Sequence, residues 1–196
     1  WMRRAAAYSE QENVRDAKTM ANLFNTLNQL PKPTVARVQG PAYGGGVGLV
    51  ACCDIAIATF DAQFAFSEVR LGIIPGVIAP YVIAAIGERR ARRYMLSGER
   101  FSASEAYRIG LLHEIVPSDE ELDNAIGEVV DDLLAGSPQA HDQCKSLIRA
   151  VTGKPVTDQL IEETSRRIAR ARAGEEGREG IAAFLENRRP WWFAGQ

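Results

Sequence analysis

The sequence predicts an α/β fold built on parallel strands, followed by a region that is entirely helical. Up to residue 117, short β-branched or apolar runs alternate with short helical patterns and glycine-rich turns. After residue 117 only helical periodicity is found. We therefore expect an α/β core over residues 1–117 and a helical region over residues 118–196.

The composition excludes several classes of protein. The chain has 196 residues, of which 46% are hydrophobic and 24% charged, as in ordinary globular proteins. It has no apolar stretch of membrane-spanning length, and its formal net charge of −2 argues against a nucleic-acid partner. Three cysteines, two of them adjacent, predict buried free thiols in a reducing compartment, the cytoplasm. His113 and His141 lack neighbours at ligand spacing, so we expect no metal site.

The elements before the glycine-rich stretch and just after it follow from local patterns. A capping box, Ser9 with Glu12, begins a helix that ends before Pro31. Residues 34–38 predict a strand, which leads into the turn 40–46 and a short buried helix over 47–53. The apolar run 54–59 predicts a strand that is covered on both faces, and 64–66 a third strand.

The remaining elements are mostly helical. We expect helices over 80–86 and 89–96, a short helix between a second capping box (Ser102 with Glu105) and Gly110, and a last strand within 111–116. We expect the later helices to begin at a third capping box (Ser118 with Glu121), at Pro138 and at Pro155. Gly174 and Gly177 separate the last of these from a final helical segment.

Three successive glycines, Gly44, Gly45 and Gly46, carry the first chemical signal. They stand between a predicted strand and a predicted helix, where their N–H groups are unshielded by side chains and lie at the positive end of the helix dipole. Such a turn can hold an oxyanion or a phosphate, and it can equally be a tight packing turn. The spacing matches neither the dinucleotide-binding nor the P-loop pattern.

This part of the chain resembles the crotonase (enoyl-CoA hydratase/isomerase) superfamily. The matching segments are G-P-A-Y-G-G-G, C-D-I-A-I-A, A-Q-F-x-x-x-E, L-G-I-I-P-G, S-G-E-R-F-S-A-S-E-A and the tail E-G-I-A-A-F-L-E-N-R. The resemblance covers nearly the whole chain. It implies a spiral of short ββα repeats, a helical C-terminal trimerisation region, and a homotrimer or dimer of trimers. It also implies acyl-CoA substrates, with no cofactor beyond the coenzyme A that the substrate carries.

The resemblance also implies the site residues. Gly45 matches the glycine whose N–H forms half of the oxyanion hole, and Glu68 matches the acid that exchanges a proton with the substrate's α-carbon. For a Glu taken alone, a surface charge would be the simpler interpretation. The other positions that the resemblance assigns to substrate binding are Gly44, Gly46, Gly48, Arg70, Pro75, Gly76 and Phe184.

Two departures from the family pattern affect this transfer. Gly48 stands where hydratases that use two carboxylates carry a second Glu, so nothing at this position can activate water. The family's chains are also longer at the N-terminus, where a further motif supplies the other oxyanion N–H. We therefore expect this chain to be N-terminally incomplete.

The details of G-G-G-V-G-L-V-A-C-C-D and F-S-E-V-R-L-G most resemble bacterial methylglutaconyl-CoA hydratase-like proteins of leucine and isoprenoid breakdown. Arg70 lies two residues after Glu68, and the two share a face if the segment is extended. One interpretation is that Arg70 pairs with a distal substrate carboxylate. The alternative is a salt bridge within the protein or a solvent-facing arginine. The predicted function is enoyl-CoA hydration. The alternatives are an enoyl-CoA isomerase that uses a single Glu, or a catalytically silent subunit of the same fold.

Overall fold

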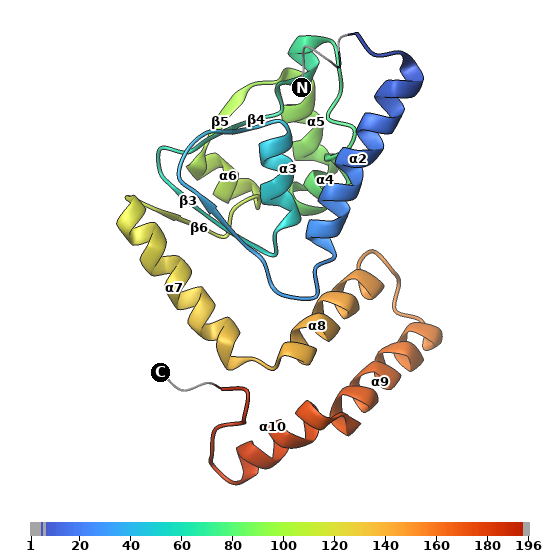
Figure 1. The fold of residues 1–196 in the computed structure, drawn as a ribbon, viewed down its shortest axis with the longest axis vertical. Helices are drawn as coiled ribbons and strands as arrows, with labels where there is room; N and C mark the ends of the chain where they lie inside the picture. The colour runs from blue at the N-terminus through green and yellow to red at the C-terminus, as the bar shows by residue number, and fades with distance from the viewer. Residues whose placement is uncertain (1–4, 6, 194–196) are drawn as a thin grey trace. The chain divides into compact units, whose positions relative to one another are not determined.

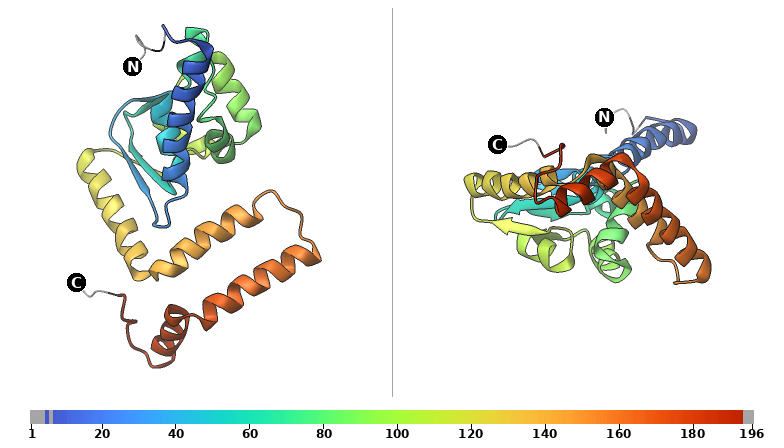
Figure 2. Two further views of the ribbon diagram at one scale, coloured as in Figure 1. Left: turned by 45° about the vertical axis from the view of Figure 1, so that its right-hand side comes forward. Right: turned by 90° about the horizontal axis from the view of Figure 1, so that it is seen from below.

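The computed structural model describes residue 5 and residues 7–193, which form two compact units. The first unit runs up to residue 126 except for residues 30–33; the second consists of 30–33 and the chain from 127 onward. The predicted boundary at residue 117 follows the last strand, whereas the compact units divide nine residues later, inside a helix. Figures 1 and 2 show the elements of both units.

One three-stranded parallel sheet lies in the first unit. Its strands are β1 (Val35–Val38), β3 (Ile55–Thr59) and β6 (Glu114–Val116), in the order β1-β3-β6. The central strand β3 is buried over four of its five residues. This confirms the expectation from its apolar sequence, since a strand with alternating polar residues would have one solvated face.

A second, smaller sheet has the order β2-β4-β5. β2 (Ala42–Tyr43) and β4 (Gln63–Ala65) run parallel, whereas β5 (Arg100–Ser102) pairs with β4 in the antiparallel direction. The expectation of purely parallel pairing is therefore wrong for β5. The sequence pattern also missed β2 and β5, because two or three residues are too few to show alternation.

Helices pack around these strands. Phe24 and Val47 are fully buried, and Phe24 belongs to the same apolar core as Ile78, Val82 and Phe66. Figure 1 shows the helices of the first unit beside the two sheets. They are α2 (Glu10–Asn28), α3 (Gly45–Cys52), α4 (Ala79–Ile86), α5 (Glu88–Ser97) and α6 (Ala103–Ile109).

The predicted capping boxes form to different degrees. At the first, the Ser9 hydroxyl accepts from the Glu12 N–H at 3.3 Å and the Glu12 carboxylate accepts from the Ser9 N–H at 2.8 Å, which confirms the motif. At the second, the Ser102 hydroxyl accepts from the Glu105 N–H, but the Glu105 carboxylate binds Arg108 and the Tyr94 hydroxyl. The reciprocal half of this box is therefore wrong, because a charged partner holds the carboxylate more strongly than a backbone N–H does.

The second unit is helical. α7 (Asp119–Ala135) leads into it, and α8 (Pro138–Val151), α9 (Asp158–Ala173) and α10 (Glu175–Leu185) follow, as Figure 2 shows. Thr157 caps α9, so this helix begins at Asp158, three residues later than the expected start at Pro155. Gly177 was expected to separate two helical segments and instead lies inside α10. Among the described residues no strand follows Val116, and none of their helices is long and apolar enough to cross a membrane.

Candidate active site

Glu68 lies in a short 3-10 helix, η1 (Ser67–Leu71), directly after β4. Phe66, the residue before η1, is completely buried and anchors the start of this turn. Gly72, in the left-handed region with φ of +72°, ends it, and the Ile73 N–H donates back to the Glu68 carbonyl at 3.2 Å. A buried aromatic residue on one side and a glycine on the other thus fix the position of Glu68.

The glycine turn lies between β2 and α3. Gly44 precedes the helix with φ of +52°, a conformation that favours glycine, and its N–H donates to the Ala65 carbonyl of β4 at 2.9 Å. Gly45 and Gly46 are the first residues of α3, so their N–H groups have no partner within the helix. These N–H groups lie at the positive end of the helix dipole and favour a negatively charged oxygen.

The Glu68 carboxylate faces this turn. Its Oε1 atom lies 2.9 Å from the position that a Cβ atom would take at Gly44, so only glycine leaves room for it. Its Oε2 atom is buried and has no hydrogen-bond partner among the described residues. A buried carboxylate oxygen that no protein donor satisfies is unfavourable for stability, and a catalytic role is one of the reasons such a group is retained. The acid and the donors expected from the sequence therefore lie together.

Gly48 is buried one helical turn further along α3. A Cβ atom at this position would lie 2.2 Å from Cγ2 of Ile78 and 3.0 Å from Cε1 of Phe24. Such distances are far below van der Waals contact. The space that a second acidic side chain would need is therefore filled by apolar groups.

Arg70 does not share the face of Glu68. A 3-10 helix has three residues per turn, so Arg70 aligns with Ser67, and Glu68 aligns with Leu71. The condition for a shared face, an extended segment, is therefore not met. The Arg70 side chain instead runs beside Gly98, where its Nε atom lies 3.1 Å from the position of a Cβ atom.

The other predicted substrate-binding residues are spread along the chain. A Cβ atom at Gly46 would meet Ala42 at 3.7 Å, so this glycine packs on the end of β2. Pro75 is half-buried and its carbonyl accepts from the Ala79 N–H at the start of α4, whereas Gly76 is exposed. Phe184 is 82% exposed on α10, in the second unit.

The two histidines and the buried Cys52 have structural rather than chemical roles. The Ala56 N–H donates to Nδ1 of His113 at 3.1 Å, and Nε2 of His141 lies 2.8 Å from the Leu133 carbonyl oxygen. His141 is half-buried. Burial raises the pKa of the Cys52 thiol to about 12, which keeps it protonated and unreactive. No group of residues suited to a metal ion occurs in the described part of the chain.

Comparison with known proteins identifies the family. The family model described as enoyl-CoA hydratase/isomerase matches residues 3–195. The crystal structure of an enoyl-CoA hydratase from Shewanella pealeana is 46% identical with a TM-score of 0.94, over 98% of this chain and 71% of that one. AtuE of Pseudomonas aeruginosa is 35% identical with a TM-score of 0.93, over 98% and 74% of the two chains. The chain therefore belongs to the enoyl-CoA hydratase/isomerase family and has its α/β fold.

A curated relative gives the same assignment. The enoyl-CoA hydratase AKT6-1 of Alternaria alternata is 34% identical over 171 residues, which are 87% of this chain and 57% of the relative. The chain thus spans little more than half the length of this relative and about three quarters of the two solved structures. AKT6-1 and the Shewanella pealeana protein are both enoyl-CoA hydratases by name, and enzymes of that activity are lyases.

Proposed function

We propose that the full-length protein is an enoyl-CoA hydratase, which adds water to an α,β-unsaturated acyl-CoA. The observation that carries this proposal is the Glu68 carboxylate, with one buried oxygen lacking a partner among the described residues and the other against Gly44, at the start of α3. An acid beside unpaired backbone donors suits the chemistry of a thioester, whose carbonyl oxygen gains negative charge while its α-carbon gains a proton.

The proposed reaction proceeds through an enolate-like state. The thioester oxygen accepts a hydrogen bond from the Gly45 N–H, and the helix dipole of α3 stabilises the charge that develops on it. As the oxygen of a water molecule bonds to the β-carbon, a proton of that water passes to the Glu68 carboxylate and the electron pair of the double bond moves toward the thioester oxygen. Glu68 then protonates the α-carbon, which completes the addition.

A single carboxylate performs both proton transfers in this scheme. Ile78 and Phe24 leave no room for an acidic side chain at position 48, so α3 supplies no second acid there. The same observation favours a second candidate function, enoyl-CoA isomerisation. In that reaction one Glu carries a proton from one carbon to another, and no water needs to be activated.

For the acyl group, we propose one with a second carboxylate, such as 3-methylglutaconyl-CoA. The support is the resemblance of the segments around Gly48 and Glu68 to methylglutaconyl-CoA hydratase-like proteins.

We also propose that the protein assembles as a trimer or a dimer of trimers through its helical second unit. Several aliphatic and aromatic side chains of this unit are exposed in the single chain, more than its own packing explains. They are Leu134, Ile148, Ile161, Ile168, Ile181, Phe184 and Leu185. Light scattering of the full-length protein at micromolar concentration should give a trimer or hexamer mass; a stable monomer would contradict this proposal.

The test of the function is a reaction in heavy-oxygen water. The full-length protein is incubated with a panel of enoyl-CoA thioesters, and the products are analysed by mass spectrometry. Label in a hydroxyacyl product supports the hydratase. Migration of the double bond without label shows the isomerase, and no reaction with any thioester indicates the catalytically silent subunit.

A further inference from the structure

A small cavity lies beside η1 and the second sheet, within the first unit. It has a volume of about 280 Å³ and its lining includes Tyr43 and Ser67. Tyr43 directly precedes Gly44 and Ser67 directly precedes Glu68, so the lining includes the sequence neighbours of both parts of the candidate site. Its charged lining residues are Arg70 and Arg100, with no carboxylate.

The strand register explains why Arg100 reaches the cavity. Tyr43 pairs with Ala65, and Ala65 pairs with Arg100, so these three residues form one row across the sheet and their side chains share a face. Because the middle residue is only an alanine, the Arg100 guanidinium extends over it and lies 5.3 Å from the centre of the Tyr43 ring. This cation–π contact holds a positive charge at the cavity wall.

The geometry of η1 supplies the second cation. Ser67 and Arg70 lie on one side of the 3-10 helix, and both line the cavity together with Leu71. Leu71 aligns with Glu68 on the other side of the turn, so residues from both sides of η1 line the cavity. Gly98 also lines the cavity and lies against the side chains of Arg70 and Val69.

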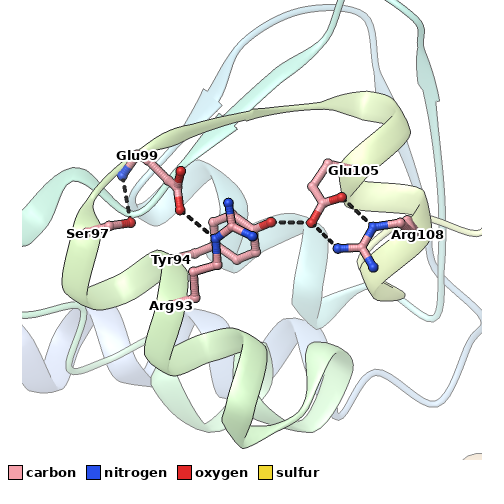
Figure 3. Close-up of polar contacts among 6 residues, drawn as sticks. All are labelled: Arg93, Tyr94, Ser97, Glu99, Glu105 and Arg108. Atoms are coloured by element: carbon pink, nitrogen blue, oxygen red, sulfur yellow. Dashed lines mark hydrogen bonds and ion pairs between the residues drawn. The ribbon is translucent and has the colours of Figure 1, made fainter.

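Neither arginine is neutralised. Among the described residues, Arg70 and Arg100 take part in no ion pair. Glu99, the acidic neighbour of Arg100 in sequence, is instead bound to Arg93 at 2.8 Å, and its N–H donates to the Ser97 hydroxyl, as Figure 3 shows. Two guanidinium groups without carboxylate partners in one cavity favour an anionic ligand, because guanidinium donors match carboxylate oxygens.

We propose that this cavity binds a carboxylate on the acyl group of the substrate, and that Arg70 and Arg100 select acyl-CoA thioesters that carry one. The proposal rests on the proposed function, because it takes Glu68 as the group that meets the α-carbon. The cavity has room for a short carboxylate-bearing branch, and a neutral hydrocarbon chain would form no ion pair with the two exposed guanidinium groups.

The test compares two substrates that differ only in this carboxylate. Glutaconyl-CoA is crotonyl-CoA with a carboxylate on its terminal carbon. The full-length protein should have the higher kcat/KM for glutaconyl-CoA. In Arg70→Gln and in Arg100→Gln, the ratio of the two kcat/KM values should fall about tenfold, as expected when a charge-assisted hydrogen bond is lost. Arg89→Gln, which removes an exposed arginine of α5 outside the cavity, should leave the ratio unchanged.

A binding measurement separates this proposal from the proposed function. Calorimetric titration with the unreactive analogues glutaryl-CoA and butyryl-CoA needs no turnover, and both variants should weaken the binding of glutaryl-CoA about tenfold relative to butyryl-CoA. Equal weakening of both analogues would show that the arginines hold a phosphate of coenzyme A, and no weakening would show that they hold no anion. Either result overturns the proposal, whether or not the protein hydrates enoyl-CoA.

Discussion

The side chain of Ile78 occupies the space beside Gly48. A Cβ atom at position 48 would lie 2.2 Å from Cγ2 of Ile78, and both residues are buried in the core of the first unit. Core packing therefore requires a glycine at position 48, and the same glycine leaves this position without an acid. Helix α3 can approach α4 closely only because it has no side chain there.

Gly48→Ala should lower the free energy of unfolding by about 1–3 kcal/mol, the usual effect of forcing an extra carbon into a packed core. Gly40→Ala is the matched control, because no atom lies within 4 Å of its Cβ position. Urea unfolding of both variants measures the difference. If Gly48→Ala is as stable as Gly40→Ala, the close contact between Gly48 and Ile78 is not present in the protein.

Gly44→Ala should reduce activity more than stability. The added Cβ atom would lie 2.9 Å from Oε1 of Glu68 and would displace the carboxylate, and a displacement of about 1 Å can lower kcat about a hundredfold. Gly153→Ala is a control for an alanine at positive φ, at +72° against +52°, with no atom near its Cβ position. We expect a loss of kcat in Gly44→Ala alone; equal kcat values would argue against the assigned position of Glu68.

Glu105 should make the stability of the first unit depend on acid pH. Its contacts with Arg108, then with the Tyr94 hydroxyl, lower its pKa to about 2 from the usual 4.5 (Figure 3). A lowered pKa in the folded state means that the carboxylate stabilises the fold above about pH 4.5, and that this contribution is lost as the pH falls toward 2.

Glu105→Gln should therefore be less stable than the parent protein at pH 7, by about 1–2 kcal/mol, since Arg108 is largely exposed and water weakens the ion pair. The difference between the two proteins should shrink below pH 4. Urea unfolding at pH 7, 4 and 3 measures it. A difference that stays constant with pH would mean that the charge of Glu105 contributes nothing.

Much of the architecture was predictable because each element carries its own local signal. The Ser9 capping box, the apolar strand at 55–59 and the glycine that ends α5 are all specified by residues within a few positions of one another. The placement of Glu68 beside Gly44 could be expected only from the resemblance to a family. No periodicity relates two residues so far apart in the sequence.

The features that sequence reasoning missed depend on pairing and on local helix type. The proximity of Tyr43 and Arg100 follows from the register of β4 with both of its neighbours, and strands of two or three residues give no pattern from which to infer it. Arg70 and Glu68 would share a face only in an extended segment, and the five residues form a 3-10 helix instead. The clash at Gly48 depends on Ile78, thirty residues away in sequence, which only tertiary packing brings close.

The most direct test of the account is the transfer of solvent hydrogen to the α-carbon by Glu68. The full-length protein and its Glu68→Gln variant are incubated with crotonyl-CoA in deuterated water, and deuterium at the α-carbon of the hydroxyacyl product is followed over time. The amide cannot exchange a proton, so the rate should fall by about two to four orders of magnitude, while butyryl-CoA binding changes little. Incorporation by Glu68→Gln at close to the parent rate would contradict the assignment of Glu68 as the catalytic acid.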